Sequence, residues 1–293
     1  MNVIEIEHIT KDYGNGKGVF DVSFSVEKGE VMGFLGPNGA GKTTTIRQLM
    51  GFIKPDSGSV SIGKLDCFSN VRMIQQNLGY LPGEIAFMDD MTGTRFIRLI
   101  AAMKGLHDLS RAEKLQAFFE LDAGGKIKKM SKGMKQKIGI VCAFMQDTDI
   151  LILDEPTSGL DPLMQNKFIE LILHEKSRGK TILMSSHLFE EVEKTCDRTA
   201  IIRGGRIVTV KSMAALQAKR QKRITVRFAS VANASAFAAN MNDSVLQNES
   251  VIVPVSDINA FLKALAPYRI LDLTTHTQSL EELFMHFYEE DAR

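Results

Sequence analysis

The chain reads Gly36-Pro-Asn-Gly-Ala-Gly-Lys-Thr43 between a short apolar run, residues 30–35, and a helical pattern over residues 41–50. This stretch fits the pattern G-x-x-x-x-G-K-[ST], in which glycines let backbone amides point inward around phosphate. The strand, loop and helix context is the one in which the pattern cradles a nucleotide. We therefore predict that Lys42 reaches the β- and γ-phosphates and that the Thr43 hydroxyl ligates Mg²⁺.

A second motif lies well downstream. Residues 150–155 read Ile-Leu-Ile-Leu-Asp-Glu, which places Asp154 and Glu155 at the end of a buried strand. Such a strand end is a weak signal by itself, but it becomes strong beside a phosphate cradle. Asp154 can steady the Mg²⁺ shell, and Glu155 can polarise the attacking water. The two motifs together predict a site that hydrolyses its nucleotide.

Strands and helices alternate around these motifs. Residues 3–9 and 20–26 have the alternation of half-buried strands, and we expect an opening antiparallel layer. Residues 92–145 follow a helical pattern, which predicts a helical insertion, and strands then alternate with helices up to residue 202. The predicted fold class is α/β, a P-loop NTPase with a parallel sheet, an antiparallel β layer and a helical subdomain at about residues 85–148.

A polar, basic stretch over residues 217–223 is interpreted as a linker. It separates a first domain, residues 1–216, from an accessory domain, residues 223–293. The pattern beyond it predicts strands and helices in the order β-α-β-β-α-β, which is typical of a small ferredoxin-like α+β domain. A final helix is predicted from an apolar stripe, for which core packing is the favoured explanation. The stripe consists of Leu280, Leu283, Phe284, Phe287 and Tyr288.

Composition excludes several classes of protein. The 36 basic and 35 acidic side chains leave a net charge of +1, which favours neither a nucleic-acid binder nor a membrane-surface binder. Residues 126–137 carry six lysines without interleaved aromatic residues, and we interpret them as a solvated face. The three cysteines form no metal-binding or CxxC pattern, which indicates a reducing compartment. We expect no signal peptide, no membrane span and no nucleic-acid partner.

Over about residues 3–215 the chain resembles the ATP-binding subunit of ABC transporters, and further segments support this. Residues 130–134, Met-Ser-Lys-Gly-Met, are similar to the family's LSGGQ signature, matching it at Ser131 and Gly133. Residues 158–161, Ser-Gly-Leu-Asp, resemble the D-loop and end in Asp161. His187, in Ser-Ser-His, corresponds to the switch histidine that contacts the γ-phosphate. Tyr13 lies where the family stacks an aromatic ring on adenine.

The resemblance implies the following site. Glu155 and His187 would be catalytic, and Thr43 and Asp154 would hold Mg²⁺. The remaining contacts to ATP would come from Tyr13, Gly36, Asn38, Gly39, Ala40, Gly41, Lys42, Thr43, Thr44, Ser131, Gly133 and Asp161.

One departure concerns the Q-loop. Residues 78–82, Leu-Gly-Tyr-Leu-Pro, resemble the strand that enters it, but Gly83 stands at the position of the family's glutamine. Glu84 follows and is the obvious substitute for the side chain that senses the metal.

The resemblance also implies an activity and partners. We expect an ATPase that uses ATP and Mg²⁺ to drive an integral membrane permease, which is encoded separately. The ATPase subunits would form a homodimer or heterodimer. They would be cytoplasmic and bound peripherally, through the permease, to the inner face of the cell membrane. The tail, residues 279–284, is similar to the ending of exporter subunits. The alternative is a mechanotransmitter that drives a membrane signalling or hydrolase partner without moving substrate. Chromosome-type ABC ATPases are disfavoured because coiled-coil heptads are lacking, and translation-factor types because only one cassette is present.

Overall fold

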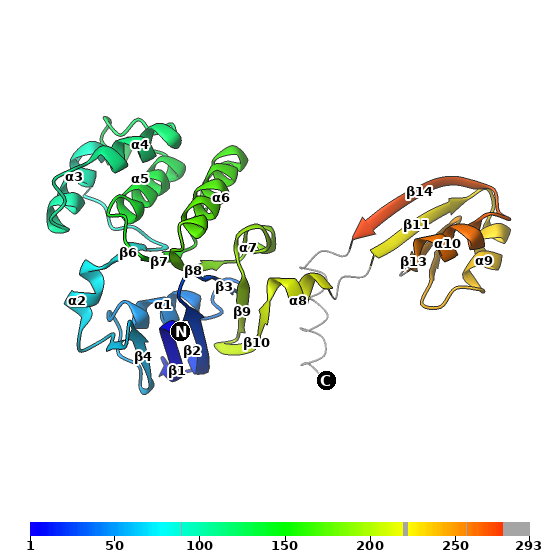
Figure 1. Cartoon of the computed structure of the whole chain (residues 1–293), viewed down its shortest axis with the longest axis horizontal. Coiled ribbons are helices and arrows are strands. Elements are labelled where there is room, and N and C mark those ends of the chain that lie inside the picture. Colours follow the sequence, from blue (N-terminus) through cyan, green and yellow to red (C-terminus); the bar gives the residue numbers. More distant parts are fainter. Residues whose placement is uncertain (89, 219–221, 256, 278–293) are drawn as a thin grey trace. The chain divides into compact units, whose positions relative to one another are not determined.

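The computed structural model describes the chain except for residues 89, 219–221, 256 and 278–293. Contacts divide it into two compact units, Met1–Met213 and Ala214–Arg293 (Figure 1). The division falls close to the predicted limit at residue 216, within helix α8 (Met213–Ala218). The predicted α/β fold class is confirmed, whereas the exact domain limits stay predictions.

The first unit opens with an antiparallel sheet in the strand order β2-β1-β4-β5. Its strands are β1 (Asn2–Asp12), β2 (Gly18–Glu27), β4 (Ser57–Ile62) and β5 (Leu65–Asp66). β1 and β2 pair as expected, with Ile4 opposite Val26 and Ile6 opposite Phe24. All four of these side chains are buried, because the alternation of apolar residues places them on one face. β4 and β5 were not predicted from the sequence.

A six-stranded sheet forms the centre of the first unit, in the order β10-β9-β3-β8-β7-β6. Its strands are β3 (Val31–Leu35), β6 (Leu78–Leu81), β7 (Ile150–Asp154), β8 (Thr181–Ser186), β9 (Arg198–Arg203) and β10 (Arg206–Ser212). All neighbours are parallel except β10, which is antiparallel to β9. Every residue of β3 and β8 is buried, as expected of central parallel strands. Because β3, β8 and β7 run parallel, the carboxyl ends of β3 and β7 lie at the same edge of the sheet.

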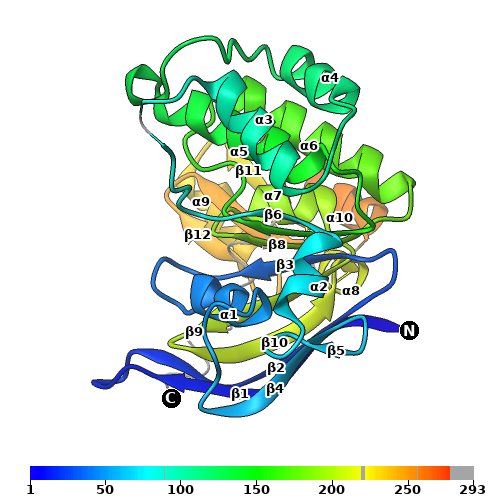
Figure 2. The same ribbon diagram turned by 90° about the vertical axis from the view of Figure 1, so that its left-hand side faces the viewer.

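Helices cover both faces of this sheet. Those of the first unit are α1 (Lys42–Leu49), α2 (Val71–Gln76), α3 (Gly93–Met103), α4 (Ser110–Phe118), α5 (Lys132–Phe144), α6 (Pro162–Ser177) and α7 (Phe189–Thr195). Figure 2 shows α1 between the central sheet and the antiparallel sheet, where it contacts β7 and β4. On the opposite side, α3 and α4 pack against α5, and α7 packs against β3 and β8.

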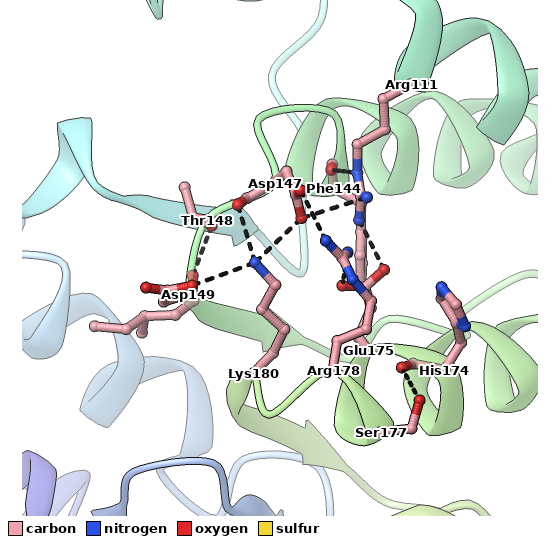
Figure 3. A network of polar contacts seen from close by, with 11 residues as sticks. Arg111, Phe144, Asp147, Thr148, Asp149, His174, Glu175, Ser177, Arg178 and Lys180 are labelled. Carbon is pink, nitrogen blue, oxygen red and sulfur yellow. Dashed lines mark hydrogen bonds and ion pairs between the residues drawn. The ribbon is translucent and has the colours of Figure 1, made fainter.

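A network of charged side chains connects α4 with the end of α6 (Figure 3). Glu175 is 1% exposed, and its two oxygens lie 2.7 Å from Arg111 Nη2 and 2.9 Å from Arg178 Nη1. Asp147, which precedes β7, contacts Arg178 at 2.8 Å and Lys180 at 3.1 Å. The network therefore ties the helical part of the first unit to the start of β7 and β8.

In its described residues the second unit has a four-stranded antiparallel sheet, and helices α9 and α10 follow two of the strands. The strand order is β12-β13-β11-β14, and the elements follow one another as β-α-β-β-α-β. They are β11 (Lys222–Phe228), α9 (Val231–Ala238), β12 (Val245–Gln247), β13 (Ser250–Pro254), α10 (Ile258–Leu265) and β14 (Ile270–Thr277). The core forms around Val226, Phe228, Phe237 and Phe261.

Two sequence predictions need comment here. The stretch 217–223 is not a linker throughout, because α8 extends to Ala218 and β11 already begins at Lys222. The final helix, predicted from the stripe at residues 280–288, lies outside the described residues. Among the residues that are described, no helix has the length and apolar character to cross a membrane.

Candidate functional site

The loop between β3 and α1 has a backbone that depends on glycine. Gly39 and Gly41 have φ angles of 79° and 113°, in the region that side chains disfavour. A Cβ at Gly41 would lie 2.6 Å from Val19 Cγ1, and one at Gly36 would lie 2.4 Å from the carbonyl oxygen of Ile202. The loop can therefore lie close against its neighbours. Helix α1 begins directly after the loop, and no side chain caps its N-terminus. A loop followed by an uncapped helix N-terminus is an arrangement that binds phosphate.

Lys42 is the first residue of α1 and is only 5% exposed. Its Nζ donates hydrogen bonds to the carbonyl oxygens of Gly36 at 2.6 Å and Pro37 at 3.1 Å. The same atom lies 3.0 Å from Glu155 Oε1. The ammonium group is therefore held between the loop and the carboxylate that follows β7.

Asp154 ends β7 and is fully buried. Its Oδ1 accepts a hydrogen bond from the Ser185 hydroxyl at 2.5 Å, whereas Oδ2 has no hydrogen-bond partner in the described part of the chain. A Cβ at Gly83 would lie 3.1 Å from Oδ2, so the glycine leaves space beside this oxygen. Buried carboxylate oxygens require a partner, and an oxygen next to open space suits a hard divalent cation.

Glu155 adopts a φ of 48°, which is uncommon for a residue with a side chain. Its backbone N–H donates to the Ser185 hydroxyl at 2.9 Å, and its Oε2 lies 2.5 Å from His187 Nδ1. Backbone strain of this kind persists where surrounding contacts enforce it and is concentrated at functional sites. The loop after β7 therefore aims Glu155 at both Lys42 and His187.

A cavity of about 610 Å³ brings the predicted residues together. Asn38, Thr43, Asp154, Glu155 and His187 all line it. Cationic side chains contribute as well, because Arg47 and Lys132 are also in its wall. Burial, reinforced by the negative charge of Asp154, raises the pKa of Tyr80 in the wall to about 12, so this phenol stays neutral. The cavity is suited to a polyanion with a bound cation.

Other predicted residues are not in the wall of this cavity. Tyr13 occupies the turn between β1 and β2, is 53% exposed and is not part of the cavity wall. Ser131 and Asp161 cap α5 and α6, accepting hydrogen bonds from the backbone N–H groups of Met134 and Met164. Gly133 lies against the D-loop, where a Cβ would approach the carbonyl oxygen of Gly159 to 2.8 Å. Thr44 lies within α1, and its carbonyl oxygen accepts from Gln48.

Two residues that hold the site together were not predicted from the sequence. Ser185 binds both Asp154 and the backbone of Glu155, and Gln136 Nε2 donates to the carbonyl oxygens of Glu155 at 3.3 Å and Pro156 at 2.8 Å. The sequence could have indicated Ser185, because Ser-Ser-His follows a buried apolar run. The parallel pairing of β7 with β8 then places Ser185 beside Asp154. Gln136 gave no such signal, because its contact joins α5 to a loop 20 residues away.

Comparison with known proteins identifies the family. The family model described as ABC transporter matches residues 19–158. The chain is 37% identical over 213 residues to the linearmycin resistance ATP-binding protein of Bacillus subtilis (strain 168), covering 71% of this chain and 68% of that one. It is 37% identical to the bacitracin transport ATP-binding protein of Bacillus licheniformis, with 70% and 68% covered. The Nod factor export ATP-binding protein I of Burkholderia orbicola (strain AU 1054) is 38% identical, with 69% and 68% covered.

Solved structures agree. An ATP-binding subunit of an ABC transporter superposes with a TM-score of 0.68 at 30% identity, over 74% of this chain and 92% of that one. A dimeric bacterial ABC transporter cassette superposes with a TM-score of 0.65 at 21% identity, over 72% and 98%, which shows a shared fold. The phosphate loop, the carboxylates after β7 and these likenesses lead to one conclusion. The chain belongs to the ABC transporter family, as an ATP-binding subunit that hydrolyses ATP.

Proposed function

We propose that this chain uses ATP hydrolysis to drive a separately encoded membrane permease in the direction of export. The proposal is carried by the cavity that Asp154, Glu155 and His187 line together. Lys42 Nζ contacts one of these residues, at 3.0 Å from Glu155 Oε1. The names of three relatives refer to linearmycin resistance, bacitracin transport and Nod factor export, which supports transport out of the cell. None of these names favours a mechanotransmitter. The subunit would work peripherally at the cytoplasmic face of the membrane.

The donor groups of the cavity fit Mg²⁺ bound together with ATP. Asp154 Oδ2 is buried, lacks a partner among the described residues and faces the space that Gly83 leaves. The Thr43 hydroxyl lies in the same cavity wall. Oxygen donors of this kind are the ones that Mg²⁺ prefers, and the bound ion would neutralise charge on the β- and γ-phosphates.

The remaining residues would divide the work of phosphoryl transfer. Lys42, already held at the loop, would move its Nζ from Glu155 to the triphosphate. The freed Glu155 carboxylate would then accept a proton from the attacking water, while His187 orients Glu155 and contacts the γ-phosphate. Ser185 and Gln136 would keep the Asp154 side chain and the Glu155 backbone fixed during this exchange.

We further propose a head-to-tail dimer, with either an identical or a related copy. Ser131 is exposed at the N-terminus of α5 and is not part of its own chain's cavity wall. In a dimer, Ser131 and Gly133 of one copy would contact the γ-phosphate held by Lys42 of the other. Residues 223–293 carry none of the motif residues, so we assign this accessory domain to dimer support or regulation.

A second cavity supports the assignment of a membrane partner. It measures about 260 Å³, is mainly apolar and includes Ile85, Phe96 and Ile100 in its wall. It shares Phe52, Tyr80 and Pro82 with the cavity that holds Asp154. An apolar segment of the permease bound there would contact the same loop that borders the nucleotide, which would couple the two sites.

The Glu155→Gln variant tests the proposal. The amide keeps the shape of the site but cannot take a proton, so we expect ATP turnover to fall by about 100-fold or more while ATP still binds. The variant should accumulate as an ATP-bound dimer in size-exclusion chromatography with light scattering, with Mg-ATP present. Glu190→Gln, on an exposed residue of α7, is the matched control and should behave as wild type. Turnover at the wild-type rate in Glu155→Gln would exclude the catalytic role, and a persistent monomer would contradict the dimer.

A further inference from the structure

A buried carboxyl group lies behind the catalytic residues. Glu191, on α7, is 4% exposed. Its Oε2 accepts hydrogen bonds from the Ser186 hydroxyl at 2.6 Å and from the Thr157 hydroxyl at 3.3 Å. Thr157 is itself 6% exposed and Ser186 is 1% exposed, so all three groups are shielded from water. Ser186 ends β8, where the chain passes into the His187 loop, and Thr157 lies in the loop after β7. Glu191 therefore joins the starts of two different loops.

These two loops carry the residues proposed for catalysis. Ser186 directly precedes His187, and its oxygen also accepts a hydrogen bond from the Leu188 N–H at 3.0 Å. Thr157 follows Glu155 in the turn after β7. The His187 and Glu155 side chains meet at 2.5 Å on the cavity side. Glu191 therefore connects, from the inside, the two loops whose side chains meet at the cavity.

The rest of α7 holds Glu191 firmly in place. The Thr195 hydroxyl donates to the carbonyl oxygen of Glu191 at 2.7 Å. Val192 packs closely over β3, where a Cβ at Gly33 would lie 2.6 Å from Val192 Cγ1. α7 can therefore act as a rigid support for a side chain that reaches into both loops.

Stability alone does not explain a carboxyl group here. No cation pairs with Glu191 in the part of the chain that is described, and its Oε1 has no hydrogen-bond partner there. Burial raises the pKa of Glu191 to about 7, although the Ser186 and Thr157 hydroxyls act in the opposite direction. Burying such a group costs free energy that an apolar side chain of similar size would not require. A functional reason for this residue is therefore to be expected.

We propose that Glu191 is a positioning residue for ATP hydrolysis: it fixes the His187 loop against the turn that follows Glu155, so that these two side chains meet in the correct geometry. This inference rests on the roles proposed above for Glu155 and His187. Glu191 touches neither nucleotide nor water in this scheme. It acts through Ser186 and Thr157.

The test compares Glu191→Ala with Glu191→Gln, using ATP turnover and ATP affinity. Glu191→Ala removes the acceptor of both hydroxyls, and we expect kcat to fall by about 10- to 100-fold, since small displacements of catalytic groups have effects of this size. The KM for ATP should stay within about threefold, because the phosphate loop is untouched. Glu191→Gln keeps an oxygen acceptor and should recover most of the activity. Glu190→Ala is the exposed control.

A double-mutant cycle with His187→Ala separates positioning from a general loss of structure. If Glu191 acts through the His187 loop, the effect of Glu191→Ala on kcat should largely disappear in the His187→Ala background. An equal loss in both backgrounds, or Glu191→Gln as inactive as Glu191→Ala, would overturn the inference. Should Glu191→Ala not fold, Ser186→Ala and Thr157→Val remove the same two contacts singly, and unchanged kcat in both would be equally decisive against it.

The outcome also distinguishes this inference from the proposed function. Wild-type turnover in Glu155→Gln and His187→Ala would refute the proposed catalytic roles themselves. Impaired turnover in those two variants, together with wild-type kcat in Glu191→Ala, would refute only the positioning role.

Discussion

The first unit contains two clusters of buried charge, and they differ in how fully their atoms are paired. In the network around Glu175, both carboxylate oxygens have an arginine partner, and Asp147 is surrounded by three cationic side chains (Figure 3). In the cluster around Asp154, Oδ2 has no hydrogen-bond partner among the described residues, and a cavity of about 610 Å³ adjoins it. Both clusters lie at ends of the same parallel strands.

The difference indicates what each cluster is for. In the saturated network Glu175 offers a cation no unpaired oxygen, and the contacts join α4, α6 and the start of β8. An unsaturated cluster keeps polar atoms available for a ligand, although this arrangement is less favourable for folding. Substitutions in the two clusters should therefore have opposite consequences for stability and for activity.

The largest effect is expected from a matched pair of lysines. Lys42 and Lys180 are 5% and 6% exposed, and each contacts a carboxylate. Lys42→Ala removes a buried cation from the triphosphate site, which should weaken ATP binding by about 2 kcal/mol or more, roughly 30-fold in affinity. Lys180→Ala should leave ATP affinity unchanged and lower stability instead. Fluorescence titration with a labelled ATP analogue, beside thermal unfolding, measures both.

Equal ATP affinities of the two lysine variants would contradict the assignment of the nucleotide site. A wild-type unfolding midpoint in Lys180→Ala would show that the network around Glu175 does not stabilise the first unit.

Glu175→Gln should mainly affect stability. It leaves Arg111 and Arg178 facing a neutral amide, and we expect a loss of about 1–3 kcal/mol, which lowers the unfolding midpoint by several degrees. ATP turnover at 25 °C should stay within about twofold of wild type, since neither Glu175 nor its two arginine partners line the cavity. Thermal unfolding followed by circular dichroism and a phosphate-release assay measure the two quantities. A variant with normal stability and reduced turnover would reverse the interpretation.

Two carboxyl groups, Asp147 in the network around Glu175 and the buried Glu191, should make stability respond to pH in opposite directions. The hydrogen bond from Arg178, supported by Lys180 and Arg111, holds the pKa of Asp147 below its ordinary value of 3.8. Its contribution to stability is present above that value and is lost as the pH falls through the lower, folded pKa. Glu191 behaves in the reverse way, because burial raises its pKa from 4.5 to about 7. Stability should therefore decrease as the pH rises from 4.5 through about 7.

Chemical denaturation between pH 3 and 8 tests this prediction with two variants. Asp147→Asn should reduce only the loss of stability that wild type shows below pH 3.8. Glu191→Gln should reduce only the loss of stability between pH 4.5 and about 7. Profiles that match wild type in both variants would show that neither carboxyl group determines the pH dependence.

The smallest effect is expected at Glu84. This residue is exposed and lines the cavity beside Gly83. Glu84→Ala should change ATP affinity of the chain alone by less than about twofold, because exposed charges contribute little. If Glu84 has replaced the sensing glutamine, turnover of the chain purified together with its membrane partner should fall by more than this. Unchanged turnover in that complex would indicate that Gly83 simply leaves room for water at the metal.

The motifs that the sequence revealed are those whose elements are local. Residues 36–43 and the Asp154-Glu155 pair each adjoin the strand that positions them, so a short window contains all the information needed. Ser185 and Gln136 act through contacts with segments 20 to 31 residues away. The parallel pairing of two buried runs could have indicated Ser185, whereas no sequence pattern pointed to Gln136. β4 was missed because it is polar and has only two buried residues, Val60 and Ile62. The start of β11 was missed because Lys222 and Arg223 continue the basic run over residues 217–223.

The contact between Lys42 and Glu155 has a consequence for selectivity among anions. A small anion such as inorganic phosphate must break this 3.0 Å ion pair before it can use the lysine, and it offers few contacts in return. A magnesium-bound triphosphate can replace the pair with several interactions along the loop at once. We therefore expect the internal ion pair to act as a built-in competitor, which keeps abundant simple anions from occupying the cradle while admitting the intended nucleotide.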